Sequence, residues 1–223
     1  MGIKSTVTTP LRADTFKKLQ LNAGVMLADF DLSSYTTASA LKTALASAIT
    51  AGTKLLGATR GGGTFVITRD VREVEADGMR AKFVGSEIVD SGDAYMSTTL
   101  IEITPDHMQK VIGNADIDTS SANHTVMTVR LAIDESDYIN NIVWVGDTNE
   151  GFMAIELLNG LNTADVTFTW ADKNEGTVTC EFHAHQDGVE YEDELPVKLH
   201  WFTDPASSSS SSGGSGGSGS GNP

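Results

Sequence analysis

The sequence predicts a β-dominated α+β domain, most simply two packed antiparallel β-sheets with one or two short flanking helices. Short runs of alternating apolar and polar residues recur along the chain, as in half-buried strands. Turn signals such as Asp77-Gly78 and Asn174-Glu175-Gly176 separate these runs. Two other segments carry a helical spacing of apolar residues, and each is followed by a glycine stop signal. Roughly nine strands and two helices follow, and strands in that number pack as layered sheets.

The segment 57–113 is predicted to form three strands and a short helix. Apolar residues alternate with polar ones over 65–75, and Asp77-Gly78 is the signal for a two-residue hairpin turn. Residues 80–89 carry the chain back as the second strand, before a polar break at 90–93. The first two strands are therefore expected to form an antiparallel hairpin.

The third strand, from 95 to 103, has two fairly apolar faces and runs into a helix with signals at both ends. Thr104 is a natural N-cap, Pro105 fits the first helical position, and Gly113 supplies the residue after the last turn. Asp106 complements the helix dipole. The apolar stripe of the helix comprises Met108, Val111 and Ile112. A helix this short persists only if its stripe packs on a sheet.

The amino-terminal part is predicted to hold an arm and the longest helix. Residues 1–35 have mixed polarity with a short strand-like alternation, and we interpret them as an arm or edge strand. The composition turns Ala-rich from Thr36 to Ala51, and Gly52 is a stop signal. One helical face carries Leu41, Leu45, Ala48 and Ile49. So narrow a stripe predicts a helix on the outside of a sheet.

The carboxy-terminal half is predicted to be almost entirely strand. A polar connection at 114–124 precedes the first of these strands, and residues 134–137 form an exposed acidic turn. The predicted strands are 125–133, 138–146, 151–158, 166–170, 178–184 and 195–201. Trp144, Trp170 and Trp201 each fall in an alternating apolar series, which predicts that all three lie in the core.

Length and composition predict one domain with a tail. Residues 1–206 are enough for one substantial core and short for two. Residues 207–223 are almost entirely Ser and Gly, and such a sequence cannot bury enough surface to offset its chain entropy. We expect a flexible tail there, which could equally be a linker, a tether for a further domain or an added segment.

Charge and cysteine content exclude several classes of function. Fifteen basic and thirty acidic residues leave a formal net charge of −15 at pH 7, which argues against ordinary nucleic-acid binding. Cys180 is the single cysteine, so neither a disulfide within the chain nor a cysteine metal cluster is expected. The sequence has no signal-peptide core and no run long enough to span a membrane. We expect a soluble protein made in the cytoplasm.

Three patterns that could carry chemistry have plainer structural explanations. Glu181, His183 and His185 have the spacing for metal ligands on one strand face, but a solvated face opposite a buried one explains them as well. Gly61-Gly62-Gly63 lacks the Lys of a phosphate loop and leads into a strand, which predicts a flexible segment or a bulge. Cys180 has no histidine on its own strand face. We therefore expect no catalytic, cofactor or metal site, and no enzyme.

Five motifs in a fixed order resemble a known family. The central ones are LGATRGGGTFVITRDVREVEADG and MSTTLIEITPDHMQKVIG. The others are PLRADTFKKLQLNAGVML near the amino terminus and, later, SDYINNIVWVGDTNEGFMAIELLNGLNT and GTVTCEFHAHQD. Together these motifs, which cover roughly 10–204, resemble the tail tube (major tail) protein of long-tailed bacteriophages and related prophages.

The resemblance implies a structural function. It implies a β-sandwich subunit whose sheets join around a ring of six copies, and rings that stack into a tube in the virion tail. Such a tube houses the tape-measure protein, meets tail terminator or tip proteins at its ends, and passes DNA without binding it specifically. An acidic lumen would repel phosphates while DNA moves. The resemblance implies no metal and no membrane partner.

The resemblance suggests which residues would line the tube. By the resemblance, the joined sheet includes strands of the 64–89 hairpin, which makes Asp70, Glu73, Glu75 and Glu87 the lumen candidates. Alternation places Glu73 and Glu75 on one face with Arg69 unless a bulge intervenes, so basic residues could neutralise part of the charge. A different class of function stays open, namely a β-sandwich binding module of a carbohydrate-binding or adhesin type.

Overall fold

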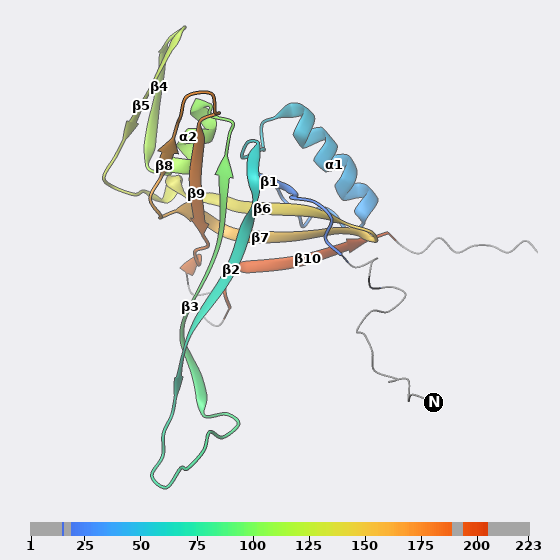
Figure 1. Ribbon diagram of the computed structural model, residues 1–223, viewed down its shortest axis with the longest axis vertical. Coiled ribbons are helices and arrows are strands. Elements are labelled where there is room, and N and C mark those ends of the chain that lie inside the picture. The colour runs from blue at the N-terminus through green and yellow to red at the C-terminus, as the bar shows by residue number, and fades with distance from the viewer. Residues whose placement is uncertain (1–14, 16–18, 189–193, 205–223) are drawn as a thin grey trace, which may run out of the picture.

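The computed structural model describes residues 15, 19–188 and 194–204, and Figure 1 shows their arrangement. The predicted tail at 207–223 and most of the arm before residue 19 lie outside the described residues. Eight strands form one antiparallel sheet in the order β1-β6-β7-β9-β3-β2, with β10 paired to β7 and β8 paired to β9. The β-dominated α+β class is confirmed, and the described strands of one copy do not close into a barrel.

Strand β7 divides this sheet into two layers. Its main length pairs with β6 and β10, whereas its last residues, Leu161 and Asn162, pair with His183 and Phe182 of β9. The first layer consists of β1 (Val25–Ala28), β6 (Ile139–Thr148), β7 (Gly151–Asn162) and β10 (Val197–Thr203). The second layer consists of β2 (Thr59–Glu73), β3 (Glu87–Leu100), β9 (Thr177–His183) and β8 (Thr167–Thr169).

The main core lies between the two layers. The second layer contributes the alternating buried residues of β3 and β9, among them Met96 and Phe182. The first layer contributes Ile142 and Leu157. Helix α2 (Pro105–Ile112) adds the buried Met108 and Val111. The Thr104 cap and the Gly113 stop are both present, so the predicted helix is confirmed.

A second core lies on the outer face of the first layer, beneath α1 (Ala38–Ala51). Leu41 and Leu45 pack there with Val143 and Val145 of β6. Thr37 caps the helix and Gly52 ends it with a φ of 70°. The predicted stripe was wrong at one position, because the side chain of Ile49 is 50% exposed and the small Ala38 is buried instead.

The three strands predicted around Asp77-Gly78 are in fact two. Strand β3 runs through the polar residues 90–93 without a break, and the loop from 74 to 86 is far longer than a two-residue turn. Polar residues do not end this strand because the distal half of the hairpin stands clear of both layers and is solvated on both faces (Figure 1). The register shifts at Asp70/Val71, which leaves Asp90 as an extra residue on β3.

The polar connection predicted at 114–124 is also a strand. β4 (Ala115–Ser121) and β5 (His124–Val129) pair as a separate two-stranded sheet beside α2. Most residues of this hairpin are exposed, and β4 holds only two apolar residues, Ala115 and Ile117, so its sequence gives a weak strand signal. The hairpin of β6 and β7, with its turn at Asn149-Glu150, is confirmed.

Two of the three tryptophans predicted to lie in the core are on the surface. Trp170 is 78% exposed and Trp201 is 67% exposed, while Trp144 is partly buried. On β10 the buried residue is Phe202, which packs in the core beneath α1. Trp201 faces the other side of the first layer, where the second layer does not cover it.

Candidate assembly surfaces

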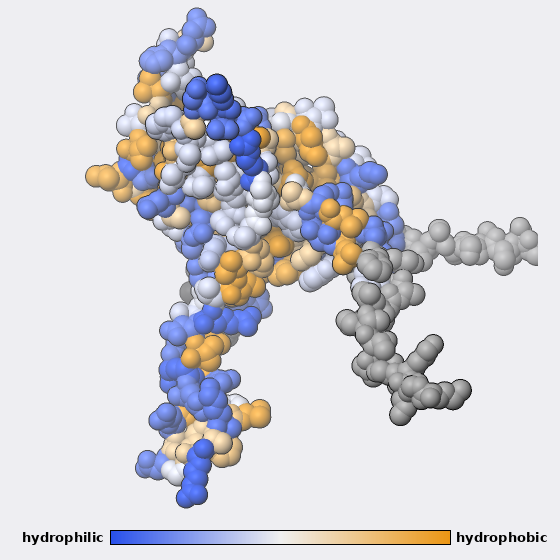
Figure 2. Space-filling view, viewed as in Figure 1, coloured by the Kyte–Doolittle hydropathy of each residue, from blue (hydrophilic) through white to orange (hydrophobic). Residues whose placement is uncertain are grey.

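The hairpin of β2 and β3 projects from the body along the longest axis of the molecule (Figure 1). Its stalk and loop expose apolar side chains that touch no core, in patches that Figure 2 shows among polar surface. These residues are Val71, Val74, Phe83, Val84, Ile88 and Val89. Phe83 is 64% exposed and Val84 is fully exposed. An apolar surface of this kind on a projecting arm indicates a protein contact.

Ion pairs hold the loop of this hairpin to its stalk. The Lys82 ammonium lies 3.1 Å from Glu87 and 3.4 Å from Glu73, which face each other across β2 and β3. Hydrogen bonds to Glu87 and Glu73 raise the pKa of Lys82. Arg72 pairs with the extra residue Asp90 at 2.7 Å. Exposed pairs stabilise little individually, but these orient the loop residues next to Phe83.

The structure does not bring the four lumen candidates onto one strand face. Asp70 pairs with Ser91, whereas Glu73 and Glu87 pair with each other on the opposite face. Glu75 lies in the loop beyond β2. Because the extra residue at the bulge belongs to β3, the alternation of β2 continues, and Glu73 shares a face with Arg69 as the sequence predicted. Which of them faces a lumen stays a prediction.

The face of the second layer turned away from the core, here called the open face, is polar. Asp93, Tyr95, Glu181 and His183 lie together on it. His183 Nδ1 is 2.8 Å from Asp93 Oδ2, its Nε2 is 3.2 Å from Glu181 Oε1, and its ring stacks on Tyr95. The third residue of the predicted trio, His185, contacts the Asn159 carbonyl instead. Within the described ranges, no group of three or more His, Cys, Asp or Glu side chains could hold a metal ion.

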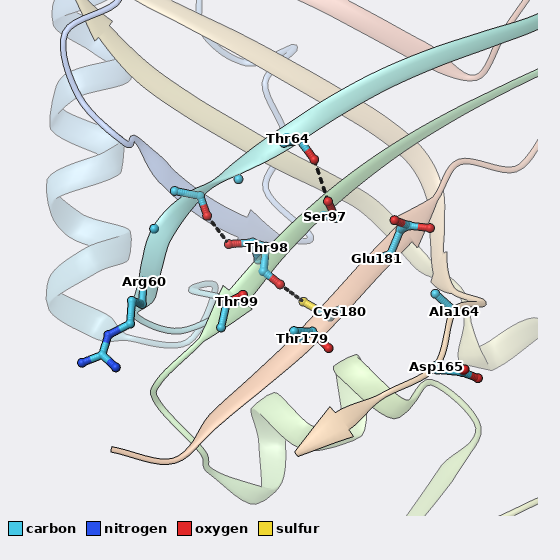
Figure 3. A pocket seen from close by; sticks show the side chains of 13 residues that line it. Arg60, Thr64, Ser97, Thr98, Thr99, Ala164, Asp165, Thr179, Cys180 and Glu181 are labelled. Carbon is cyan, nitrogen blue, oxygen red and sulfur yellow. Dashed lines mark hydrogen bonds between the residues drawn. The ribbon is translucent and has the colours of Figure 1, made fainter. Parts of the chain in front are cut away.

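The glycine run forms a bulge beside a hollow in the open face (Figure 3). Thr59 pairs with Leu100 and Gly63 with Thr98, so residues 60–62 together oppose a single residue of β3. Gly61 and Gly62 have φ values of 80° and 78°, which side chains rarely adopt. The predicted bulge is thus confirmed. Hydroxyl side chains line much of the hollow, whose volume is about 470 Å³, and Figure 3 places Arg60 at one rim and Asp165 at the other.

The acidic turn is organised by one arginine. Residues 134–137 form a short 3₁₀ turn, η2 (Glu135–Asp137), that is largely exposed as predicted. Arg130, next to β5, pairs with Asp134 and Asp137 of the turn and, at 3.1 Å, with Asp116 of β4. These contacts fix the β4–β5 hairpin to the chain that leads into β6.

Sequence reasoning missed the exposed apolar residues that are the clearest mark of these surfaces. It assigned Phe83 and Val84 to a paired strand, because it read Asp77-Gly78 as the whole turn. The available signal was the length of polar chain between the two apolar runs, which is too long for a two-residue turn. The described helices include none that is long and apolar enough to cross a membrane.

Comparisons with known proteins give solved structures of limited similarity. No family model and no curated protein matches the sequence. A structure described as the virion of a native gene transfer agent (GTA) particle is similar over 82% of this chain and 100% of its own, with 8% identity and a TM-score of 0.41. A second, the tail of an empty GTA particle with C6 symmetry, covers 74% of this chain and 92% of its own, with 8% identity and a TM-score of 0.35. A likeness of this degree does not by itself assign a function.

Proposed function

We propose that this protein is a structural subunit of a phage-type tail tube, in which rings of six copies stack into a hollow tube. The observation that carries the proposal is the projecting β2–β3 hairpin, whose exposed Phe83 and Val84 have no covering surface within one copy's described residues. Such a surface is costly to leave in water and is typical of an assembly contact. The resemblance of the five sequence motifs to tail tube proteins supplies the kind of assembly.

The partners of these surfaces are further copies of the same chain. The hairpin extends beyond the subunit's own layers, so it can reach a neighbouring copy along the tube (Figure 1). The second layer of each copy joins the second layers of its neighbours around the ring, and this pairing would cover the edge strands of the layer. Contacts between different surfaces of identical copies close into rings when the rotation allows it. The tape-measure protein would occupy the tube during assembly, with tail terminator or tip proteins at its ends.

The charge of the chain suits a conduit for DNA. Each copy has a formal net charge of −15, and a ring multiplies that charge sixfold. Asp70, Asp93 and Glu181 lie on the open face among hydroxyl side chains. If this face lines the tube, it presents phosphates with repulsion and few cationic groups to hold them. On this proposal the function is structural, with no catalytic step.

Sedimentation of the purified protein tests the proposal. Concentrated wild-type protein should give fast-sedimenting polymers, or rings of six subunit masses, in equilibrium with monomer. A single species of subunit mass at all concentrations would exclude self-assembly of this chain alone and would favour the binding-module hypothesis.

The binding-module hypothesis gains one observation, because Trp170 and Trp201 are both exposed. Tryptophan is enriched at binding surfaces because its large apolar ring also carries a hydrogen-bond donor. The two residues extend from different layers, however, with Trp170 just beyond β8 and Trp201 on β10. A glycan-binding assay on monomer distinguishes the functions, since a tube subunit should bind no sugar at these positions.

A further inference from the structure

Two strand edges of the second layer have no partner on one side. In the described chain β2 pairs only with β3, and β8 pairs only with β9, so the layer ends in a free edge at each side. All pairs within the layer are antiparallel, so β8 runs opposite to β2. The β8 strand of a second copy could therefore add to β2 as an antiparallel neighbour and satisfy both edges.

A partly enclosed apolar cavity lies beside β2, the edge strand of the second layer. The cavity lies between the layers and has a volume of about 170 Å³. Its apolar lining comprises Met26, Phe65, Met96, Trp144 and Ile155. A space of about 150 Å³ is large enough for an aromatic ring. This cavity, called the flank cavity below, is thus the size of one large side chain.

The opposite edge carries exposed aromatic side chains on the matching face. Phe168 pairs with the fully buried Val178, and Phe65 at the cavity pairs with the buried Met96. Both aromatic residues therefore belong to the core side of the layer. Phe168 is 41% exposed, and Trp170, two residues further on, is 78% exposed. The β2 edge thus has an apolar cavity, and the β8 edge has exposed apolar side chains.

The strand registers place these features at compatible heights. The pairs Thr59–Leu100, Leu100–Val178 and Val178–Phe168 form one row across the layer, so Phe168 is level with the start of β2. Closing a sheet into a barrel staggers its strands, by about one residue per strand in a well-known barrel type. Four strands per copy give a stagger of about four residues. When the stagger shifts β8 toward the carboxyl-terminal end of β2, Phe168 lies opposite Phe65 and Trp170 lies opposite Gly63.

We propose that β8 of a neighbouring copy pairs with β2 and that Trp170 of that copy fills the flank cavity. This inference rests on the proposed ring assembly and names its lateral contact. Residues that fill a pocket at the centre of an interface commonly dominate its binding energy, and tryptophan is prominent among them. Trp170 is thus an assembly residue, which accounts for its exposure in a single copy.

Substitution of Trp170 tests the anchor. Trp170→Ala should raise the concentration needed for assembly at least about tenfold, while Trp170→Phe recovers part of the loss. Trp201→Ala is the matched control, because Trp201 is similarly exposed but lies on the first layer and should leave that concentration unchanged. Thermal unfolding of all three monomers should match wild type, since neither side chain is buried.

Cysteine cross-linking tests the strand neighbours directly. In the staggered register Thr169 of one copy is level with Thr64 of the next, both on the open face. The native Cys180 is buried and gives little background. Oxidising a mixture of Thr64→Cys and Thr169→Cys proteins should give a disulfide-linked dimer. A mixture of Thr64→Cys with Thr203→Cys, whose cysteine lies on β10, should not.

The outcomes separate this inference from the function on which it rests. If wild-type protein forms no rings or tubes, the proposed function fails. If wild type assembles but Trp170→Ala assembles equally well, or the Thr203→Cys mixture cross-links in place of the Thr169→Cys mixture, the lateral contact is wrong and the tube function stands.

Discussion

The hydroxyl of Thr104 accepts a hydrogen bond from the backbone amide of His107 at 3.2 Å and so caps α2. This cap lies where the chain passes from β3 to the helix that packs against the main core. Thr104→Ala should lower the free energy of unfolding by about 1 kcal/mol. Leu100→Ala, which removes a side chain that is 1% exposed, should lower it by about 2–5 kcal/mol.

Urea unfolding of the two variants checks the order of these effects. Ile101, which the sequence placed in the third strand, lies just past the end of β3 and is only partly buried, so Leu100 is the stronger probe of the core. A cap variant less stable than the Leu100 variant would show that this strand–helix junction has been misread.

The hairpin loop should matter for assembly and not for folding. Phe83→Ser combined with Val84→Ser removes exposed apolar surface, so the free energy of unfolding should change by less than about 0.5 kcal/mol per site. The double variant should no longer form polymers, as measured by sedimentation. Ile49→Ser on α1 is the control, since it removes a half-exposed apolar side chain outside the hairpin. If the loop variant polymerises like wild type, the hairpin is not an assembly arm.

Cys180 predicts a loss of stability in alkali. Burial raises the pKa of its thiol from 9.0 to about 12. Between these values the unfolded chain releases the proton while the folded chain keeps it, so stability falls as pH rises above about 9. Urea midpoints at pH 8 and pH 10 measure this fall. In Cys180→Ala the part of the fall due to the thiol should vanish, and an undiminished fall would assign it to other groups.

The acidic-bore mechanism makes a separate prediction about charge. In a structure of the assembled ring, Asp70, Asp93 and Glu181 should face the central hole, and acidic residues should outnumber Lys and Arg there. Glu73 and Glu87 are already paired with Lys82, so they should contribute little to this excess. A bore whose residues sum to zero or positive charge would refute phosphate repulsion while leaving tube assembly untouched.

The elements that sequence predicted best are those whose signals are local. Gly52 ends the first helix as predicted, and Thr104 with Gly113 bounds the second, because capping depends on a few adjacent backbone groups. The hairpin of β6 and β7 was equally readable, since buried strands on either side flank its short turn.

Alternation failed wherever burial itself is absent. Strand β4 and the distal part of β3 are solvated, so their polar residues read as breaks. Trp170 and Trp201 were predicted to lie in the core because each falls in an alternating apolar series, but both are exposed in one copy. The alternation of apolar and polar residues does not distinguish a side chain buried within one copy from one buried between two copies. The candidate surfaces are therefore identified from the fold.

Electron microscopy of the purified wild-type protein at assembly-competent concentration tests the central claim most directly. The proposed function predicts hollow tubes or rings, with a stain-filled central hole and sixfold symmetry in end-on views. Compact particles of subunit mass without a hole, under conditions in which the protein is folded, would contradict it.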